Sequence, residues 1–162
     1  MSDVAQRIAV GKLWNSGQTC VAPDYMFLPK GKTAEFIEQF ETYVFDMYPS
    51  ILNNPDYTSI VNDKQYNRLQ GYLENAKKLV AKIIEINPQS EDASVNRKIV
   101  PTILTGVTSD MEIMKNEIFG PILPIMEYDQ IDDVLAFINS RPRPLALYYF
   151  DFDQARADYI VQ

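Results

Sequence analysis

Apolar residues in the first half of the chain recur at intervals of three and four, which is the spacing of one face of a helix. This pattern predicts three helices, from residue 2 or 3 to about 15, from 32 to 47, and from 62 to about 80. Gly17 is a candidate for the left-handed residue that ends the first helix. The third helix opens on a capping-box pattern, with Asn62 followed three residues later by a glutamine.

Short apolar runs between and after these helices predict strands. Residues 21–28 form such a run, which a Pro-Lys-Gly turn signal closes, and residues 99–107 and 122–128 form two more. Residues 82–86 fit either the end of the third helix or a short strand, and the polar run 87–98 is typical of a surface loop.

The last third of the chain carries further helix signals. Ser109 and Glu112 form a second capping-box pattern, which predicts a short helix toward Asn116. Asp129 and Asp132 resemble a capping signal before another helix, which an Arg-Pro-Arg-Pro stretch ends.

A continuous apolar run at 145–150 is followed by a last helical pattern, which begins at Asp151 and continues to residue 162. Helix and strand thus alternate along most of the chain. This alternation predicts a three-layer α/β/α fold with a mostly parallel sheet.

Composition and charge narrow the classes of function. The chain has 162 residues, of which 46% are apolar and 23% charged, which is typical of one globular domain. Fifteen basic residues against twenty-two acidic ones give a net charge of −7, which argues against nucleic acid or an anionic membrane as a partner. We find no membrane-spanning apolar run and no secretory leader pattern, so we expect a cytoplasmic protein.

The absence of histidine and the single cysteine exclude several kinds of site. Without histidine, the chain alone cannot build a Ser-His-Asp triad, a Cys-His pair or a His-ligated zinc site, and we expect no metal site. Without a second cysteine it cannot form an internal disulfide. Cys20 is therefore either a buried small residue or a lone reactive thiol.

Two segments could carry chemistry. Cys20 lies where a helix stop meets a predicted strand, and the backbone N–H groups of residues 17–20 could point at a ligand there. Glu117 and Phe119 share a face of a predicted extended stretch, so the carboxylate could accept hydrogen bonds from ligand hydroxyls while the ring offers a flat surface. From the residues alone, a solvated glutamate and a core phenylalanine are the favoured interpretation.

Taken together, these segments resemble the catalytic half of the aldehyde dehydrogenase superfamily over essentially the whole chain. The pattern Gly-Lys-x-x-Asn-x-Gly-Gln-x-Cys at residues 11–20 resembles the nucleophile signature, and Glu-Ile-Phe-Gly-Pro at 117–121 resembles the second signature. Residues 17–25, 101–105 and 144–148 are similar to the branch with coniferyl aldehyde and fatty or aromatic aldehyde dehydrogenases.

The resemblance implies a role for each candidate residue. Cys20 would attack the aldehyde carbon, Glu117 would bind the ribose hydroxyls of NAD or NADP, and Phe119 would pack near the nicotinamide ring. It also implies an oxyanion held partly by the N–H of Cys20, and a thioester that an activated water hydrolyses. The complete enzyme would act on a small-molecule aldehyde as a homo-oligomer.

The chain departs from the complete family pattern. The dinucleotide-binding half, with the activating glutamate and the asparagine oxyanion donor, would precede residue 1, and the oligomerisation segment would follow residue 162. We therefore expect residues 1–162 to be a single catalytic-domain fragment that is inactive alone. Two alternatives stay open: a non-catalytic structural or assembly module with the same fold, and a free-standing thiol-dependent redox or acyl-transfer protein.

Overall fold

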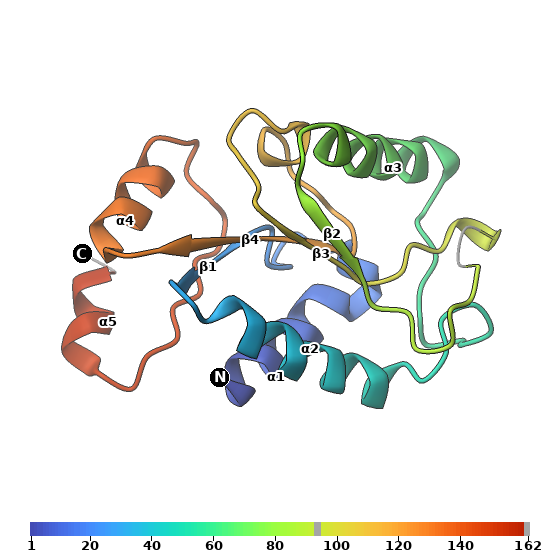
Figure 1. Cartoon of the computed structure of the whole chain (residues 1–162), viewed down its shortest axis with the longest axis horizontal. Helices are drawn as coiled ribbons and strands as arrows, with labels where there is room; N and C mark the ends of the chain where they lie inside the picture. Colours follow the sequence, from blue (N-terminus) through green and yellow to red (C-terminus); the bar gives the residue numbers. More distant parts are fainter. Residues whose placement is uncertain (93–94, 161–162) are drawn as a thin grey trace.

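Four short strands form one sheet in the computed structural model, which describes residues 1–92 and 95–160 (Figure 1). The sheet order is β1–β4–β3–β2; β4 pairs in parallel with β1 and with β3, whereas β2 pairs antiparallel with β3. The strands are β1 (Met26–Pro29), β2 (Lys82–Glu85), β3 (Thr102–Thr105) and β4 (Ile122–Tyr128). The sheet is therefore mixed but mostly parallel, as the sequence predicts.

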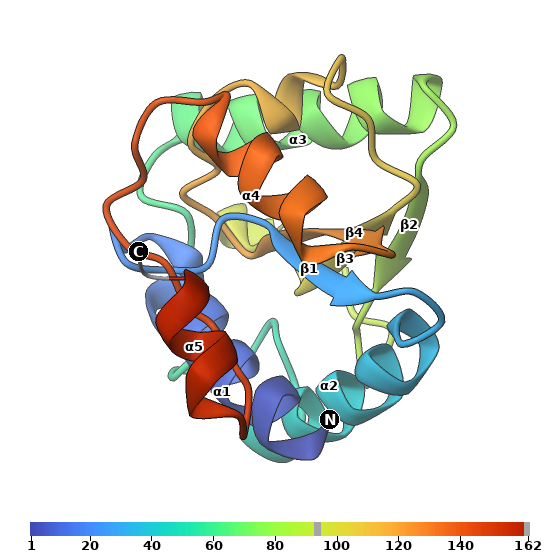
Figure 2. The same cartoon turned by 90° about the vertical axis from the view of Figure 1, so that its left-hand side faces the viewer.

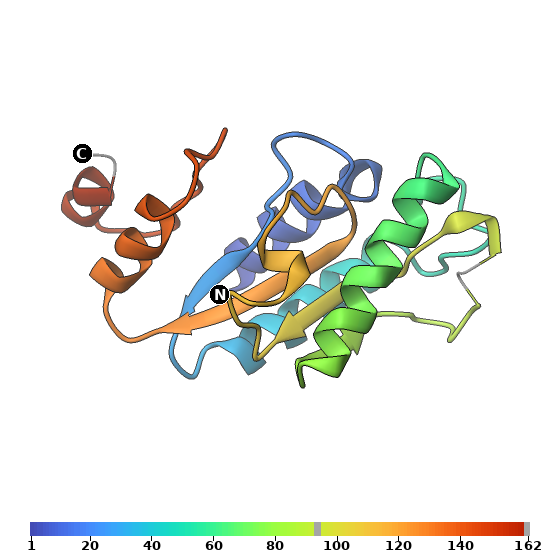
Figure 3. The same cartoon turned by 90° about the horizontal axis from the view of Figure 1, so that it is seen from above.

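Helices cover both faces of the sheet, which confirms the predicted three layers (Figures 1 and 3). Helices α1 (Ser2–Leu13) and α2 (Thr33–Met47) lie on one face, and α3 (Asp63–Lys78) lies on the other. Successive side chains of a strand point to opposite faces. Ile103 accordingly belongs to the core cluster under α1 and α2, whereas Leu104 belongs to the cluster under α3.

The remaining elements are short. They are the 3₁₀ turns η1 (Trp14–Gly17), η2 (Val95–Arg97) and η3 (Glu112–Met114), and the helices α4 (Ile131–Asn139) and α5 (Gln154–Ile160). Helix α4 follows β4 closely and turns back toward β1, the strand at one edge of the sheet (Figure 2). There Phe137 packs edge-on against Tyr25 and Phe27, with ring centroids 5.8 Å and 5.2 Å apart.

Several predicted boundaries are confirmed and others move. The strand at 122–128 is confirmed, and residues 82–86 resolve as strand β2. The first helix ends at Leu13, two residues early, and the third ends at Lys78. Val80 lies beyond the third helix, with a positive φ of 68° and a side chain 88% exposed.

The predicted strand at 21–28 is wrong for its first five residues, because the strand begins only at Met26. The N–H of Ala22 bonds back to the carbonyl of Thr19 at 3.1 Å, which makes a turn. Pro23 has no N–H to donate to a ladder. The carboxylate of Asp24 then bonds to a backbone N–H in another part of the chain. A turn therefore holds the residues after Cys20.

Only one of the predicted side-chain caps forms. The Asn62 oxygen accepts the N–H of Gln65 at 3.0 Å, as the capping box requires. The cap at Ser109 is wrong, because the Asn75 side chain of α3 instead accepts the N–H of Glu112, and only a single 3₁₀ turn follows. Helix α4 forms as predicted, but its N-cap residue is Gln130 and no side chain caps it.

The apolar run at 145–150 forms no regular structure and is largely exposed. Leu145 is 75% exposed, and Phe152 just beyond the run is fully exposed. The last helix begins at Gln154 and follows an Asp153 carboxylate that accepts the N–H of Ala155. The predicted end of this helix, residues 161–162, lies outside the described residues. No helix in the described ranges is long and apolar enough to cross a membrane.

Candidate active site

Cys20 follows a tight turn in which three successive residues have positive φ. Asn15 and Ser16 both have φ of 52°, and Gly17 has φ of 72°, which confirms the left-handed residue predicted there. The Asn15 carbonyl accepts the backbone N–H of Gln18 at 3.1 Å, and the Asn15 side chain donates to the Gln18 carbonyl at 3.2 Å. These bonds reverse the chain at the end of α1 and leave Cys20 exposed.

The turn is fixed to the loop that precedes α3. The buried side chain of Gln18 donates to the carbonyl of Ser59 at 3.1 Å and accepts the N–H of Val61 at 2.9 Å. The hydroxyl of Ser16 donates to the carbonyl of Thr58. An exposed cysteine thus lies on a turn held by hydrogen bonds to an adjacent loop, which limits its movement.

Glu117 and Phe119 lie on either side of a fully buried residue. Glu117 is exposed, Ile118 is 0% exposed, and Phe119 is 37% exposed. The sequence predicts an extended stretch here. The structure differs, because Phe119 has a positive φ of 50°. An aromatic residue rarely adopts this conformation, which costs about 1–2 kcal/mol and needs contacts that hold it.

The two segments touch through their glycines. A Cβ atom on Gly17 would lie 2.3 Å from the carbonyl oxygen of Gly120 and 2.9 Å from that of Lys12, so no side chain fits at Gly17. A Cβ on Gly120 would lie 2.6 Å from the Leu69 side chain of α3. The chain before Cys20 and the chain after Phe119 therefore touch at backbone distance, and the Leu69 side chain of α3 packs against Gly120.

Arg68 and Asp24 also join these segments, and a role for either residue was not predicted from the sequence. The Arg68 guanidinium donates to the carbonyls of Glu117 and Ile118, at 3.0 Å and 2.6 Å. The Asp24 carboxylate accepts the N–H of Ile118 at 2.9 Å. Arg68 lies 49 residues before Glu117, and no local pattern could have connected them. Asp24 lies four residues after Cys20 and could have been considered.

Lys12 is the buried charge of this region. Its side chain is 1% exposed, and burial lowers its pKa from 10.5 to about 8, while attraction to Asp24 opposes that shift. The lysine lies in the last turn of α1, five residues before Gly17. Its ammonium therefore loses a proton more readily than that of an exposed lysine.

One open cleft of about 910 Å³ brings the three predicted site residues together. Cys20, Glu117 and Phe119 all line it, and so do Lys12 and Asp24. The exposed Glu117 carboxylate can accept hydrogen bonds from sugar hydroxyls, and the exposed Phe119 ring can pack on a flat heterocycle. The residues present thus fit a nucleotide cofactor. Among the described residues, no cluster of three acidic or cysteine side chains could hold a metal ion.

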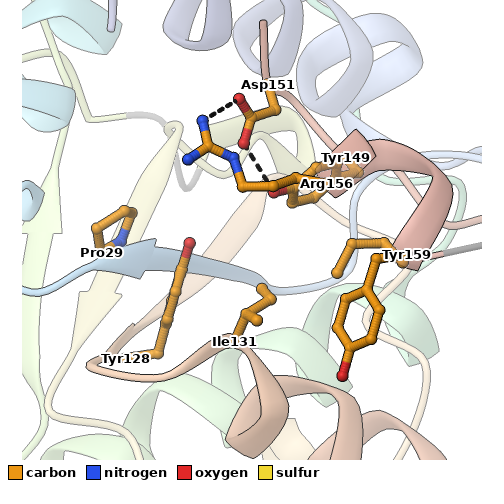
Figure 4. Close-up of a pocket in the computed structure, with 8 residues that line it drawn as sticks. Pro29, Tyr128, Ile131, Tyr149, Asp151, Arg156 and Tyr159 are labelled. Atoms are coloured by element: carbon orange, nitrogen blue, oxygen red, sulfur yellow. Dashed lines mark hydrogen bonds and ion pairs between the residues drawn. The ribbon is translucent and has the colours of Figure 1, made fainter. Parts of the chain in front are cut away.

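A second, smaller pocket of about 360 Å³ lies between the end of the sheet and α5 (Figure 4). The Arg156 guanidinium bonds to Asp151 at 2.7 Å, and Asp151 also accepts the hydroxyl of Tyr149 at 2.8 Å. The bond to Arg156 is the main cause that lowers the pKa of Asp151. This pocket contains none of the residues of the two signature segments.

Comparisons with known proteins identify the class. A model of the aldehyde dehydrogenase family matches residues 1–162. The chain is 44% identical over 161 residues to a probable coniferyl aldehyde dehydrogenase of Pseudomonas aeruginosa, covering 99% of this chain and 33% of that protein. The chain belongs to the aldehyde dehydrogenase family.

Solved structures agree with this assignment. The fold matches a substrate-bound AldH of Staphylococcus aureus with a TM-score of 0.85 and 39% identity, over 97% of this chain and 33% of that one. It also matches an NAD-dependent benzaldehyde dehydrogenase of Corynebacterium glutamicum with a TM-score of 0.79 and 28% identity, over 98% and 34%. The chain spans about a third of the length of the relatives it matches.

Proposed function

We propose that the chain is the catalytic segment of a nicotinamide-dependent aldehyde dehydrogenase, with Cys20 as the nucleophile. The proposal rests on one observation: an exposed cysteine, an exposed carboxylate and an exposed aromatic ring line the same cleft. In this proposal residues 1–162 form one catalytic unit, and the dinucleotide-binding half and the oligomerisation segment are supplied outside them.

The first step is addition of the Cys20 thiolate to the carbonyl carbon of the aldehyde. A carbon–sulfur bond forms, and the carbonyl oxygen becomes an oxyanion. In the part of the chain that the structure describes, the backbone N–H of Cys20 makes no hydrogen bond to the protein, so it is available to that oxygen. The hydrogen-bonded turn before Cys20 keeps the sulfur in place during the attack.

Glu117 and Phe119 position the cofactor. The carboxylate accepts hydrogen bonds from the ribose hydroxyls, and the ring packs beside the nicotinamide. A bound nicotinamide would accept the hydride that the carbon attached to Cys20 loses when the thiohemiacetal becomes a thioester. Water then cleaves the carbon–sulfur bond, which releases the carboxylic acid and regenerates the thiol. In this proposal the water is activated by a glutamate outside residues 1–162, the one that the resemblance to the family implies.

The proposed substrate is an aromatic aldehyde, such as coniferyl aldehyde, or a long-chain aldehyde. The support is the similarity to the Pseudomonas aeruginosa protein, which is named a probable coniferyl aldehyde dehydrogenase, and to the benzaldehyde dehydrogenase. The cleft in this chain is lined by aromatic and aliphatic side chains, including Phe119 and Tyr148, which suits an apolar aldehyde.

A chimera tests this proposal directly. Residues 1–162 would replace the matching third of the Pseudomonas aeruginosa protein, and aldehyde-dependent formation of NADH or NADPH would be measured. We expect oxidation by the chimera and none by its Cys20→Ser variant. A folded chimera in which Cys20→Ser retains full turnover would contradict the proposal.

The purified 162-residue chain should form no NADH or NADPH with any aldehyde, because in this proposal the half that binds the dinucleotide lies outside these residues. Its thiol should still react with iodoacetamide in the native state, since Cys20 is exposed. Co-purification with a full-length aldehyde dehydrogenase, together with an inactive chimera, would instead favour an assembly module that retains the fold.

A further inference from the structure

The backbone of residues 117 and 118 is held by side chains from two other segments of the chain. From α3, the guanidinium of Arg68 bonds to two consecutive carbonyls, those of Glu117 and Ile118. From the irregular stretch between Cys20 and β1, the carboxylate of Asp24 accepts the N–H of Ile118. The N–H and the carbonyl of the buried Ile118 are therefore both bonded to charged side chains. Hydrogen bonds to charged groups are stronger than those between neutral groups.

Arg68 is itself held in one orientation. Its Nε donates to the Gln65 side chain at 2.6 Å, and one terminal nitrogen donates to the Tyr72 hydroxyl at 3.1 Å. Its carbon Cζ lies 5.1 Å from the centroid of the Tyr72 ring. The planar guanidinium thus meets partners on α3 and on the signature segment at once, a geometry that a lysine ammonium cannot reproduce.

The residue that follows the carbonyls held by Arg68 has a strained backbone. Phe119 has a φ of 50°, although it is neither glycine nor asparagine. Such a residue returns to an ordinary backbone region unless its surroundings hold it. The two carbonyls immediately before Phe119 are those that Arg68 holds, and the residue after it, Gly120, lies against Gly17.

We propose that Arg68 is a positioning residue, which holds the backbone of residues 117–119 so that Glu117 and Phe119 both face the cleft. Without it, the peptide after Ile118 rotates, Phe119 leaves the left-handed conformation, and the two side chains no longer point to the same ligand. That this ligand is the nicotinamide cofactor rests on the proposed function; the positioning itself does not.

Amide hydrogen exchange and NMR of the 162-residue chain test the proposal without cofactor or turnover. In Arg68→Met we expect exchange of the Ile118 amide to rise roughly tenfold relative to the Phe40 amide in α2, because the segment opens locally. The Phe119 Cα chemical shift and its three-bond coupling should leave the values of a left-handed residue. Arg68→Lys should change both in the same direction, since it keeps only the charge.

Lys64→Met is the matched control, because Lys64 is an exposed cation on the same helix, and it should leave both signals unchanged. An equal rise in exchange at Ile118 and Phe40 would show that Arg68 only stabilises the fold, and would overturn the proposal. So would an unchanged Phe119 signal. Should Arg68→Met fail to fold, Arg68→Lys decides between the same outcomes. An inactive chimera would contradict the proposed function and leave these signals intact.

Discussion

The α2 side of the core and the junction between the two signature segments are held together by different means. In the core, Phe36 and Phe40 of α2 are almost fully buried, with ring centroids 5.6 Å apart. At the junction, glycine backbones touch, and charged side chains bond to backbone atoms. Apolar contact is non-directional and tolerates small shifts, whereas the junction depends on the direction of each bond. Stability and site geometry should therefore respond to different substitutions.

The largest loss of stability should come from the core. Phe40→Ala removes a ring that is 1% exposed and should lower the free energy of unfolding by about 4 kcal/mol in urea titrations. Phe45→Ala, on the same helix but 45% exposed, should cost about 0.5 kcal/mol. Neither should change the rate at which iodoacetamide labels Cys20 in the native state. A changed rate in Phe40→Ala would mean that core and junction are coupled.

Gly17→Ala should cost about 3 kcal/mol, because it adds a clash with the Gly120 carbonyl to the strain of a left-handed alanine. Gly31→Ala is the control: its φ of 78° is similar, but nothing lies within 4 Å of the added carbon, so it should cost about 1 kcal/mol. Only Gly17→Ala should also change the labelling rate of Cys20. Equal losses in the two variants would remove the evidence for close backbone contact at the junction.

The buried Lys12 makes the free energy of unfolding of the chain depend on pH. Its pKa is about 8 in the folded chain and 10.5 when exposed, so between these values the unfolded chain binds more protons. The free energy of unfolding should therefore rise with pH in that window, by about 2 kcal/mol between pH 7 and 9.5. Lys12→Met should lack this rise. Parallel pH profiles of the two proteins would show that Lys12 does not titrate as a buried amine.

The smallest effect should come from the start of α3, the helix that carries Arg68. Asn62→Ala removes the oxygen that accepts the N–H of Gln65 and should cost about 1 kcal/mol in thermal or urea unfolding. Asn62→Asp keeps an acceptor and should cost much less. If Asn62→Ala alone also raised exchange at Ile118, the first turn of α3 would be part of the junction.

The core was predictable from the sequence, because its signal is periodic. The helix at 32–47 shows the spacing of an amphipathic helix, and both it and the strand at 122–128 appear in the structure within one residue of the expected ends. The strand at 21–28 was less predictable, since an apolar run cannot show that Asp24 bonds to Ile118 instead of facing a ladder. Periodicity reports burial but does not report which polar partner a residue meets.

The candidate site was predictable only as a set of residue types. The motifs around Cys20 and Glu117 named the side chains, and the structure places them on one cleft. The left-handed Phe119 and the bonds of Arg68 to the carbonyls of Glu117 and Ile118 could not be predicted, because they depend on an approach of segments 49 and 50 residues apart. The cap at Ser109 failed for the same reason, since the side chain of Asn75 reaches the helix start first.

The position of the only tryptophan gives the molecule an optical reporter at the junction. Trp14 stands in the turn that leads to Gly17, and its side chain is 73% exposed. Its indole is already largely hydrated in the native state, so its emission should change little when the core melts. Shifts in that emission should instead follow rearrangement of the turn in which Trp14 stands, while circular dichroism follows the helices. One sample can thus separate a change in the turn before Cys20 from loss of the fold.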